Sequence, residues 1–265
     1  MVKLEQLTKF FEELWPSFTA DDWDRVGLSV GSLDQKISKI LLSVDVTKSV
    51  LEEAKSLGCN LVLSHHPLLL RGVNEVSEQS LKGQLVSFAI KSDIAIFSAH
   101  TNADKAAIGT AAALANLFGL TATRQLDQES GHGLVGELSS PESLIQFATK
   151  IAKSLPSVAA GLKVAGDPEK LIHRVALSPG AGDADLGKAM AAGVDVFITS
   201  DLRHHPAQDF LETPGHQTAL IDIAHWASES VFLMSVAKAI TERFSDLEVV
   251  LSDVRTDPWD FAVMQ

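Results

Sequence analysis

The chain has 265 residues, a formal net charge of −12 and a single cysteine, Cys59. An acidic chain without a cluster of lysines and arginines lacks the surface of a nucleic-acid-binding protein, and no apolar run approaches the roughly 20 residues of a membrane-spanning helix. The N-terminal stretch lacks the apolar core of a signal peptide, and one cysteine cannot form an intrachain disulfide, so we expect a cytoplasmic protein.

The first half of the chain alternates predicted strands and helices. Thr47 is a candidate N-cap, and Gly58 stands just past the end of its helix. Cys59 opens the next strand, where we expect it to be buried and unreactive. This order predicts an α/β fold with a mostly parallel sheet. The expected elements are a helix over 3–15, a short strand within 21–31, strands over 37–44, 61–63 and 94–97, helices over 47–57 and 82–91, and an alanine-rich helix ending at Phe118.

A different rhythm follows, over residues 124–172. Ser140-Pro141-Glu142 is a good helix start, with Ser140 as N-cap and Pro141 as the first helical residue. That helix is expected to run to about Leu155, between strands over 133–138 and 159–164. We interpret the segment as a short accessory β/α unit. The expected division is a first α/β lobe over 1–124, then 125–265 with the accessory unit (125–172) followed by a second α/β lobe.

The second lobe resumes the alternation of strands and helices. A glycine loop, Ser178–Asp183, precedes a helix that ends near Gly193. The loop either binds an anion through its backbone N–H groups or is a tight turn that needs flexible residues. The other expected elements are strands over 174–177, 194–199, 218–223 and 249–251, and a long helix from about residue 224 to Phe244.

Two adjacent histidines stand where a buried strand ends. His65 and His66 follow the apolar run 61–63 and precede Pro67. Neighbouring residues on a strand point to opposite faces, so the pair can serve one site only where the strand has ended. In α/β sheets, ligands bind at the carboxyl ends of strands. The pattern therefore predicts a site at this edge.

An internal repeat concentrates the histidines. His-His-Pro occurs at 65–67 and again at 204–206, and Ala-His-x-x-x-acid occurs at 99–104 and 224–229. This is a divergent duplication or a coincidence. It places six of the nine histidines at four strand exits, each with a carboxylate nearby: His65, His66, His100, His204, His205 and His225. We interpret the other three, His132, His173 and His216, as surface or hydrogen-bonded residues.

The residue types at these exits predict a metal site. A histidine and a carboxylate four residues apart at a helix start share one face, as in His225 and Glu229. Imidazole and carboxylate ligands without thiolate suit zinc, iron or manganese and do not select among them. The segment from Asp24 to Gly31 is either a structural loop or contributes Asp24 and Arg25 to the edge of the pocket.

These residues carry a resemblance to a known family. The sequence resembles the Nif-three-like dinuclear metal-centre family, also described as GTP cyclohydrolase type-two-like. The matching stretches run in the family's order and cover almost the whole chain: Trp23-Asp24-Arg25-Val26-Gly27-Leu28, Ser64-His65-His66-Pro67, Ala99-His100-Thr101-Asn102-Ala103-Asp104, Ile198 to His205, Asp222 to Glu229, and Thr256-Asp257-Pro258-Trp259. The sequence departs from the family pattern at Arg25, Asp183 and Ser200, where Asn, Ser and Gly are usual.

The resemblance implies a Nif-three-like fold of two similar α/β lobes and two divalent metal ions per subunit. Transferred position by position, the ligands are His65, His66, Asp104, His225 and Glu229. His100, His204 and His205 would either hold these ligands in place or face the substrate. It also implies a toroidal homohexamer. This chain has only the short version of the segment inserted between the lobes.

Two divalent ions a few ångströms apart would activate water and polarise an electrophile, so we expect a metal-dependent hydrolase. Its small-molecule substrate would be a nucleotide, as in a ring-opening cyclohydrolase, or another phosphoester. His100 or His204 is the candidate general acid or base. The alternative is a non-catalytic metal-handling or regulatory oligomer that binds partner proteins. The sequence does not choose between them.

Overall fold

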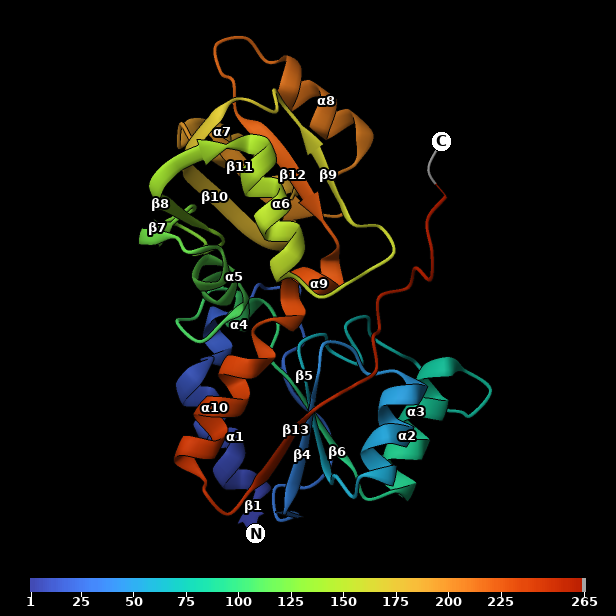
Figure 1. The fold of residues 1–265 in the computed structure, drawn as a ribbon. Coiled ribbons are helices and arrows are strands. Elements are labelled where there is room, and N and C mark those ends of the chain that lie inside the picture. The colour runs from blue at the N-terminus through green and yellow to red at the C-terminus, as the bar shows by residue number, and fades with distance from the viewer. Residues whose placement is uncertain (264–265) are drawn as a thin grey trace. The chain divides into compact units, whose positions relative to one another are not determined.

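The structure is a computed structural model that describes residues 1–263 (Figure 1). The described chain forms two compact units, each built on its own sheet. The first unit comprises Met1–Ile108 and Leu233–Thr256, and the second comprises Gly109–Phe232 and the tail from Asp257. No helix in the described part of the chain is long and apolar enough to cross a membrane.

The first unit contains a five-stranded sheet in the order β13-β4-β5-β6-β2. All neighbours are parallel except β2, which pairs antiparallel with β6. In Figure 1, α1 and α10 lie on one side of this sheet, and α2 and α3 lie on the other. The elements are β1 (Val2–Lys3), α1 (Leu4–Leu14), β2 (Gly27–Val30), β3 (Lys36–Ile37), β4 (Lys39–Ser43), α2 (Lys48–Ser56), β5 (Leu61–Ser64), α3 (Leu81–Lys91), β6 (Ala95–Ser98), α4 (Thr101–Asp104), α10 (Leu233–Arg243) and β13 (Glu248–Leu251).

Burial on both faces explains why helices cover both sides of this sheet. Leu41, Val62 and Ile96 are partners across β4, β5 and β6, and all three belong to one buried cluster with residues of α2 and α3. Successive residues of a strand point to opposite faces, so an uninterrupted apolar run serves a sheet buried on both sides. The predicted cap is also present, because Thr47 Oγ1 accepts a hydrogen bond from Val50 N at 3.3 Å.

The second unit contains a six-stranded sheet in the order β7-β8-β10-β11-β12-β9. Its centre, β10-β11-β12, is parallel, and β7, β8 and β9 pair antiparallel. Val196 and Ile198 pack in one buried cluster with α5 and α6, whereas Phe197 packs in another with α7 and α8. The elements are α5 (Thr110–Phe118), β7 (Thr121–Gln125), β8 (Leu134–Ser143), α6 (Leu144–Ser154), β9 (Leu162–Ala165), β10 (Leu171–Ala181), α7 (Leu186–Ala191), β11 (Val196–Ser200), α8 (His204–Glu212), β12 (Ala219–Ile223) and α9 (His225–Ser230).

The observed units differ from the contiguous division at residue 124. After Phe232 the chain returns to the first unit, where β13 pairs with β4. The long helix expected from residue 224 is therefore two helices, α9 and α10, which belong to different units. The segment 125–172 is not a separate accessory unit either, because β8 and β9 hydrogen-bond directly to β10 and β12. Sequence periodicity finds strands but does not show which sheet a strand joins.

The helix start expected at Ser140 is wrong. β8 continues through Ser143, and α6 begins at Leu144 with Ser143 N–H donating to Gln146 Oε1 at 3.3 Å. Pro141 lies beyond the part of β8 that pairs with β7 and at the register shift against β10. A proline is tolerated there because its missing N–H removes no ladder hydrogen bond.

Cys59 is buried, as the sequence predicts. Burial raises the pKa of its thiol to about 11, so the reactive thiolate is scarce at neutral pH. We expect a disulfide reagent such as dithionitrobenzoate, at about pH 8, to label Cys59 only after unfolding in denaturant. Fast stoichiometric labelling of the native protein, followed by absorbance, would contradict this prediction.

Candidate metal centre

Three histidines of the first unit come together where β5 and β6 end. The two strands are parallel neighbours, so their carboxyl ends meet at one edge of the sheet. His65 and His66 follow β5, and His100 follows β6 after Ala99. Each of the three rings offers a nitrogen that lies within 4.8 Å of those of the other two. The structure thus brings the three histidines of these two strand exits together.

Each of these rings is oriented through Nδ1. An imidazole that donates from Nδ1 presents the lone pair of Nε2, and such a partner commonly fixes a metal-binding histidine. The Nδ1 contacts are His65 with Ala99 O at 2.8 Å, His66 with Asp45 Oδ1 at 2.7 Å, and His100 with Asp24 Oδ1 at 2.9 Å. The structure thus supplies a carbonyl or carboxylate partner for every ring of the cluster.

Asp24 is part of this arrangement and not only of a loop. Its carboxylate is buried and accepts hydrogen bonds from Thr101 N at 3.0 Å and Thr101 Oγ1 at 2.6 Å, besides the His100 contact. Burial would raise the pKa of Asp24, but the bonds from His100 and Thr101 outweigh it and hold the pKa well below its usual range. Asp24 therefore stays ionised and braces His100. The neighbouring Arg25 guanidinium donates to the carbonyl oxygens of Asp22 and Asp24.

Asp104 joins the same cluster from α4. Its Oδ1 lies 3.5 Å from His65 Nε2. His65 is fully buried and Asp104 is mostly so. The expected helical spacing from His100 is present, because α4 begins directly after His100 and ends at Asp104. The first unit thus brings together three of the five transferred ligands, His65, His66 and Asp104.

The other two transferred ligands, His225 and Glu229, lie on α9 in the second unit. His225 Nε2 is 3.0 Å from Glu229 Oε1, one helical turn away, and His225 Nδ1 is 2.6 Å from Asp201 Oδ2. Burial would lower the pKa of His225, but the charges and hydrogen bonds of Glu229 and Asp201 together raise it to about 11. Glu229 itself is buried. The pair is therefore a histidine–carboxylate unit with its own orienting carboxylate.

The glycine loop packs against this pair. Gly180 has φ +71°, and a Cβ there would lie 2.8 Å from Glu229 Oε1. Its N–H donates to Ser228 Oγ at 3.1 Å, and its carbonyl accepts from Thr199 Oγ1 at 3.1 Å. Because the Gly180 N–H is already used, it is not available to bind an anion. Most of the expected loop is strand, since β10 runs to Ala181.

The second His-His-Pro does not repeat the geometry of the first. His204 and His205 are exposed in the first turn of α8, with ring centroids 5.1 Å apart, four residues or more after β11 ends. A proline is compatible with a first helical turn, so Pro206 does not mark a loop here. Two of the three histidines expected to be exposed or hydrogen-bonded are so, because His216 Nε2 lies 2.6 Å from Phe210 O and His173 is exposed.

The sequence patterns assign no role to Asp45 or Asp201, the carboxylates that contact His66 and His225. Asp45 stands two residues after β4, and Asp201 directly follows β11. Both therefore obey the strand-exit rule that located the histidines. Asp45 also accepts a hydrogen bond from Thr256 Oγ1, which links Thr256 to the His66 contact. Asp183, a departure from the family pattern, pairs with Arg203.

A family model described as Duf34/NIF3 (NGG1p interacting factor 3) matches residues 2–258. The chain belongs to the Duf34/NIF3 family. A protein of Streptomyces coelicolor named GTP cyclohydrolase 1 type 2 homolog is 41% identical over 98% of this chain and 94% of its own length. A protein of Clostridium perfringens with the same name is 34% identical over 98% of this chain and all of its own.

Solved structures share the fold of this Duf34/NIF3 protein. A hypothetical protein of Staphylococcus aureus is 27% identical, covers 98% of this chain and 99% of its own, and has a TM-score of 0.89. A Bacillus cereus protein related to NIF3 has the same TM-score at 22% identity, and this similarity supports only a shared fold. The family resemblance and the α/β fold class inferred from the sequence are confirmed.

The donor sets of this Duf34/NIF3 protein fit a divalent metal ion. They offer imidazole nitrogens and carboxylate oxygens, and each histidine ring is held through Nδ1 by a carboxylate or a carbonyl. The mixed set suits zinc, iron(II) or manganese. The described residues thus contain His and carboxylate groups that could bind metal, in both units.

Proposed function

We propose that the protein binds two divalent ions per subunit and is a metal-dependent hydrolase of nucleotides or other phosphoesters. The ligands in this proposal are His65, His66, Asp104, His225 and Glu229. The single observation that carries it is the Nδ1 contact of every ligand histidine, because that arrangement prepares Nε2 for a metal. Names of relatives, GTP cyclohydrolase 1 type 2 homolog, support the nucleotide class.

Bound divalent ions would supply an activated water and polarise the bond to be broken. The chain's own contribution includes His100, which we assign as general acid or base. Its ring belongs to the first cluster, and Asp24 fixes its orientation through Nδ1. His204 is the second candidate and is exposed at the start of α8. We also propose the homohexamer that the family resemblance implies.

Metal content tests the ligand assignment. We expect elemental analysis of purified protein to find about two divalent ions per subunit, and His225→Ala to lose about one or both. His173→Ala is the matched control, because His173 is an exposed histidine on β10 of the same unit. Equal metal content in His225→Ala and wild type would contradict the assignment of His225 as a ligand.

Turnover separates the hydrolase from a metal-handling protein. We expect metal-loaded protein to convert GTP or a phosphoester, followed by chromatography of the products, and His100→Ala to keep its metal but lose most of the rate, roughly 100-fold. Size-exclusion chromatography with light scattering reports the oligomer in the same samples. Full metal occupancy without turnover of any substrate would favour the metal-handling alternative.

A further inference from the structure

The second unit contains a cavity of about 320 Å³ that reaches the start of α9, the helix that carries His225 and Glu229. Ala224 and Ala227 form part of its wall, and Ala224 is the residue before His225. The volume falls at the lower end of the roughly 300–1,000 Å³ typical of small-molecule sites. All of its lining residues belong to one unit.

Several apolar side chains line the cavity, chiefly from the end of α6 to the start of β9. Leu155, Pro156, Val158 and Leu162 line it and are each only half-buried. The segment is held in a defined turn, since Gly161 N–H donates to Val158 O at 3.4 Å and Gly161 has φ +59°. A wall of partly exposed apolar side chains, held in place before a ligand arrives, is typical of a binding pocket.

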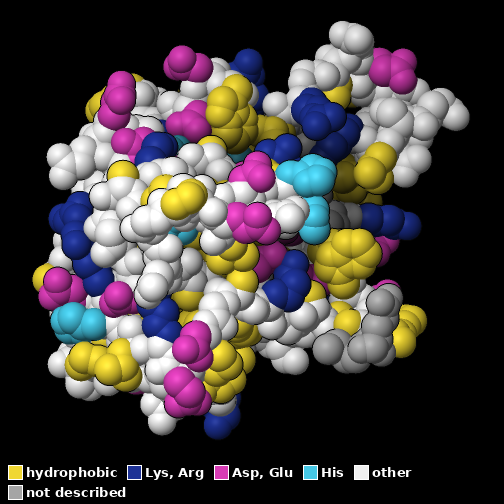
Figure 2. Space-filling view, turned by 90° about the horizontal axis from the view of Figure 1, so that it is seen from above, with side chains coloured by type: hydrophobic (Ala, Val, Ile, Leu, Met, Phe, Trp, Pro, Cys, Tyr) yellow, Lys and Arg dark blue, Asp and Glu magenta, His cyan; other side chains and the backbone are white. Residues whose placement is uncertain are grey.

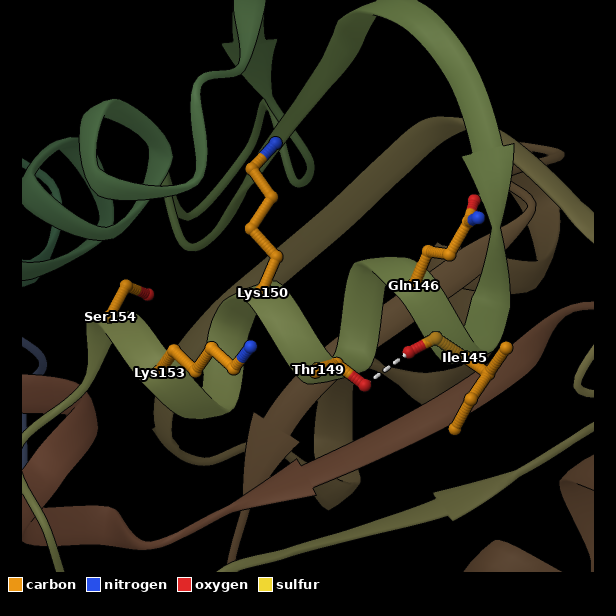
Figure 3. A pocket seen from close by; sticks show the side chains of 6 residues that line it. All are labelled: Ile145, Gln146, Thr149, Lys150, Lys153 and Ser154. Carbon is orange, nitrogen blue, oxygen red and sulfur yellow. Dashed lines mark hydrogen bonds between the residues drawn. The ribbon is translucent and has the colours of Figure 1, made fainter.

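One cation stands at the rim of this apolar cavity. Lys153, near the end of α6, lines both the cavity and a shallow groove along the outer face of α6 (Figure 3). Figure 3 shows the Lys150 and Lys153 side chains leaving the helix in different directions.

The neighbouring lysines are already neutralised. Lys150 pairs with Glu142 at 3.2 Å, and Lys163 pairs with Asp222 at 2.6 Å. Lys153, by contrast, makes no ion pair with any residue that the structure describes. On the face shown in Figure 2, Lys and Arg side chains are interspersed with Asp and Glu side chains. In a chain of net charge −12, an anionic ligand needs such a local cation.

We propose that this cavity is the anchoring subsite for the non-reacting part of the substrate, a nucleoside phosphate whose base contacts the apolar wall and whose phosphate pairs with Lys153. The inference rests on the proposed function, because Ala224 and Ala227 of the cavity wall lie at the start of α9, the helix that carries His225 and Glu229. Apolar contact with a flat base and one charge-assisted bond to the phosphate are the two interactions that the lining offers. Lys153 is a binding residue in this scheme, not a catalytic one.

Isothermal titration with guanosine 5′-monophosphate tests the subsite on the full-length, metal-loaded protein. We expect Lys153→Met to weaken binding of the monophosphate about tenfold and to leave binding of guanosine unchanged. Ala152→Phe fills the cavity from an exposed position of α6 and is expected to weaken both ligands. Lys150→Met is the matched control, one turn earlier on the same helix and outside the cavity, and should change neither.

The outcomes separate the subsite from the metal chemistry. Equal affinity of wild type and Lys153→Met for the monophosphate, or no binding to wild type at millimolar concentration, overturns the subsite. Metal content is measured on the same samples, and wild-type protein that takes up no metal overturns the proposed function instead. Protein that holds metal, and binds the monophosphate through both Lys153 and the cavity, supports both.

Discussion

Asp24→Ala is expected to lower the free energy of unfolding by about 3 kcal/mol. The buried carboxylate accepts hydrogen bonds from Thr101 N, Thr101 Oγ1 and Arg25 N and contacts His100, so its removal leaves several buried polar groups without a partner. Denaturant unfolding gives the change in free energy. Hydrogen exchange should show faster loss of protection around Thr101, whose N–H is bonded to Asp24.

Asp34→Ala is a suitable control for Asp24→Ala. Asp34 is exposed and pairs only at the surface, with Lys3 at 3.1 Å, so its loss is expected to change stability by less than about 0.5 kcal/mol. Equal effects of the two substitutions would show that the Asp24 network does not hold the loop. His100 should also lose its orientation in Asp24→Ala. We therefore expect Asp24→Ala to lower the turnover rate in any assay in which His100→Ala lowers it.

The pH dependence follows from the direction of the Asp24 shift. Its pKa is lowered in the folded protein, so the ionised form stabilises the fold above the ordinary pKa of an aspartate, about 4, and this contribution is lost as the pH falls towards the folded value. The stability difference between wild type and Asp24→Asn is therefore expected to be constant from neutral pH to about pH 5 and to shrink below it. A difference that grows in acid would contradict the assignment.

The histidine cluster was predictable because it depends on local order along the chain. His65, His66 and His100 each follow a buried strand directly or after one residue, and parallel neighbouring strands must end at the same edge. His225 follows β12 after Ala224 by the same rule. An apolar run that ends in a polar ligand is visible in the sequence without knowledge of the tertiary contacts.

The orienting carboxylates were not predictable in the same way. Asp45 and His66 are 21 residues apart, and Asp201 and His225 are 24 apart, so each contact depends on the order of strands in its sheet. The second His-His-Pro misled for a related reason. Identical triplets follow a strand at His65 and begin a helix at His204, because the residues between strand and triplet, not the triplet, decide where the next helix starts.

The same limit explains the errors in the predicted fold. In the sequence, Pro141 is typical of a helix start. Only the pairing of β8 with β10 shows that Pro141 lies in a strand, at a register shift where its missing N–H costs no hydrogen bond. The final strand, β13, is found correctly, but its partner β4 lies about two hundred positions earlier in the chain. Local pattern predicts elements, whereas long-range pairing assigns them to units.

Gly180→Ala adds a single methyl group, but we expect it to displace the side chains of the His225–Glu229 pair. A Cβ at Gly180 would lie 2.8 Å from Glu229 Oε1 and 3.5 Å from His225 Nε2, so the buried carboxylate must move. The left-handed backbone of Gly180, φ +71°, adds a strain of roughly 1–2 kcal/mol for any residue with a side chain. We expect a loss of about 2–4 kcal/mol in unfolding free energy and a lower metal content.

Gly119→Ala separates the two causes of that loss. Gly119 has nearly the same φ, +74°, and nothing lies within 4 Å of its added Cβ, so it carries the backbone strain without the clash. It belongs to the same unit, at the end of α5. Metal content should therefore be normal in Gly119→Ala and reduced in Gly180→Ala, as measured by elemental analysis. If both variants retained wild-type metal, Glu229 would not need its observed position, and its assignment as a ligand would fall with that result.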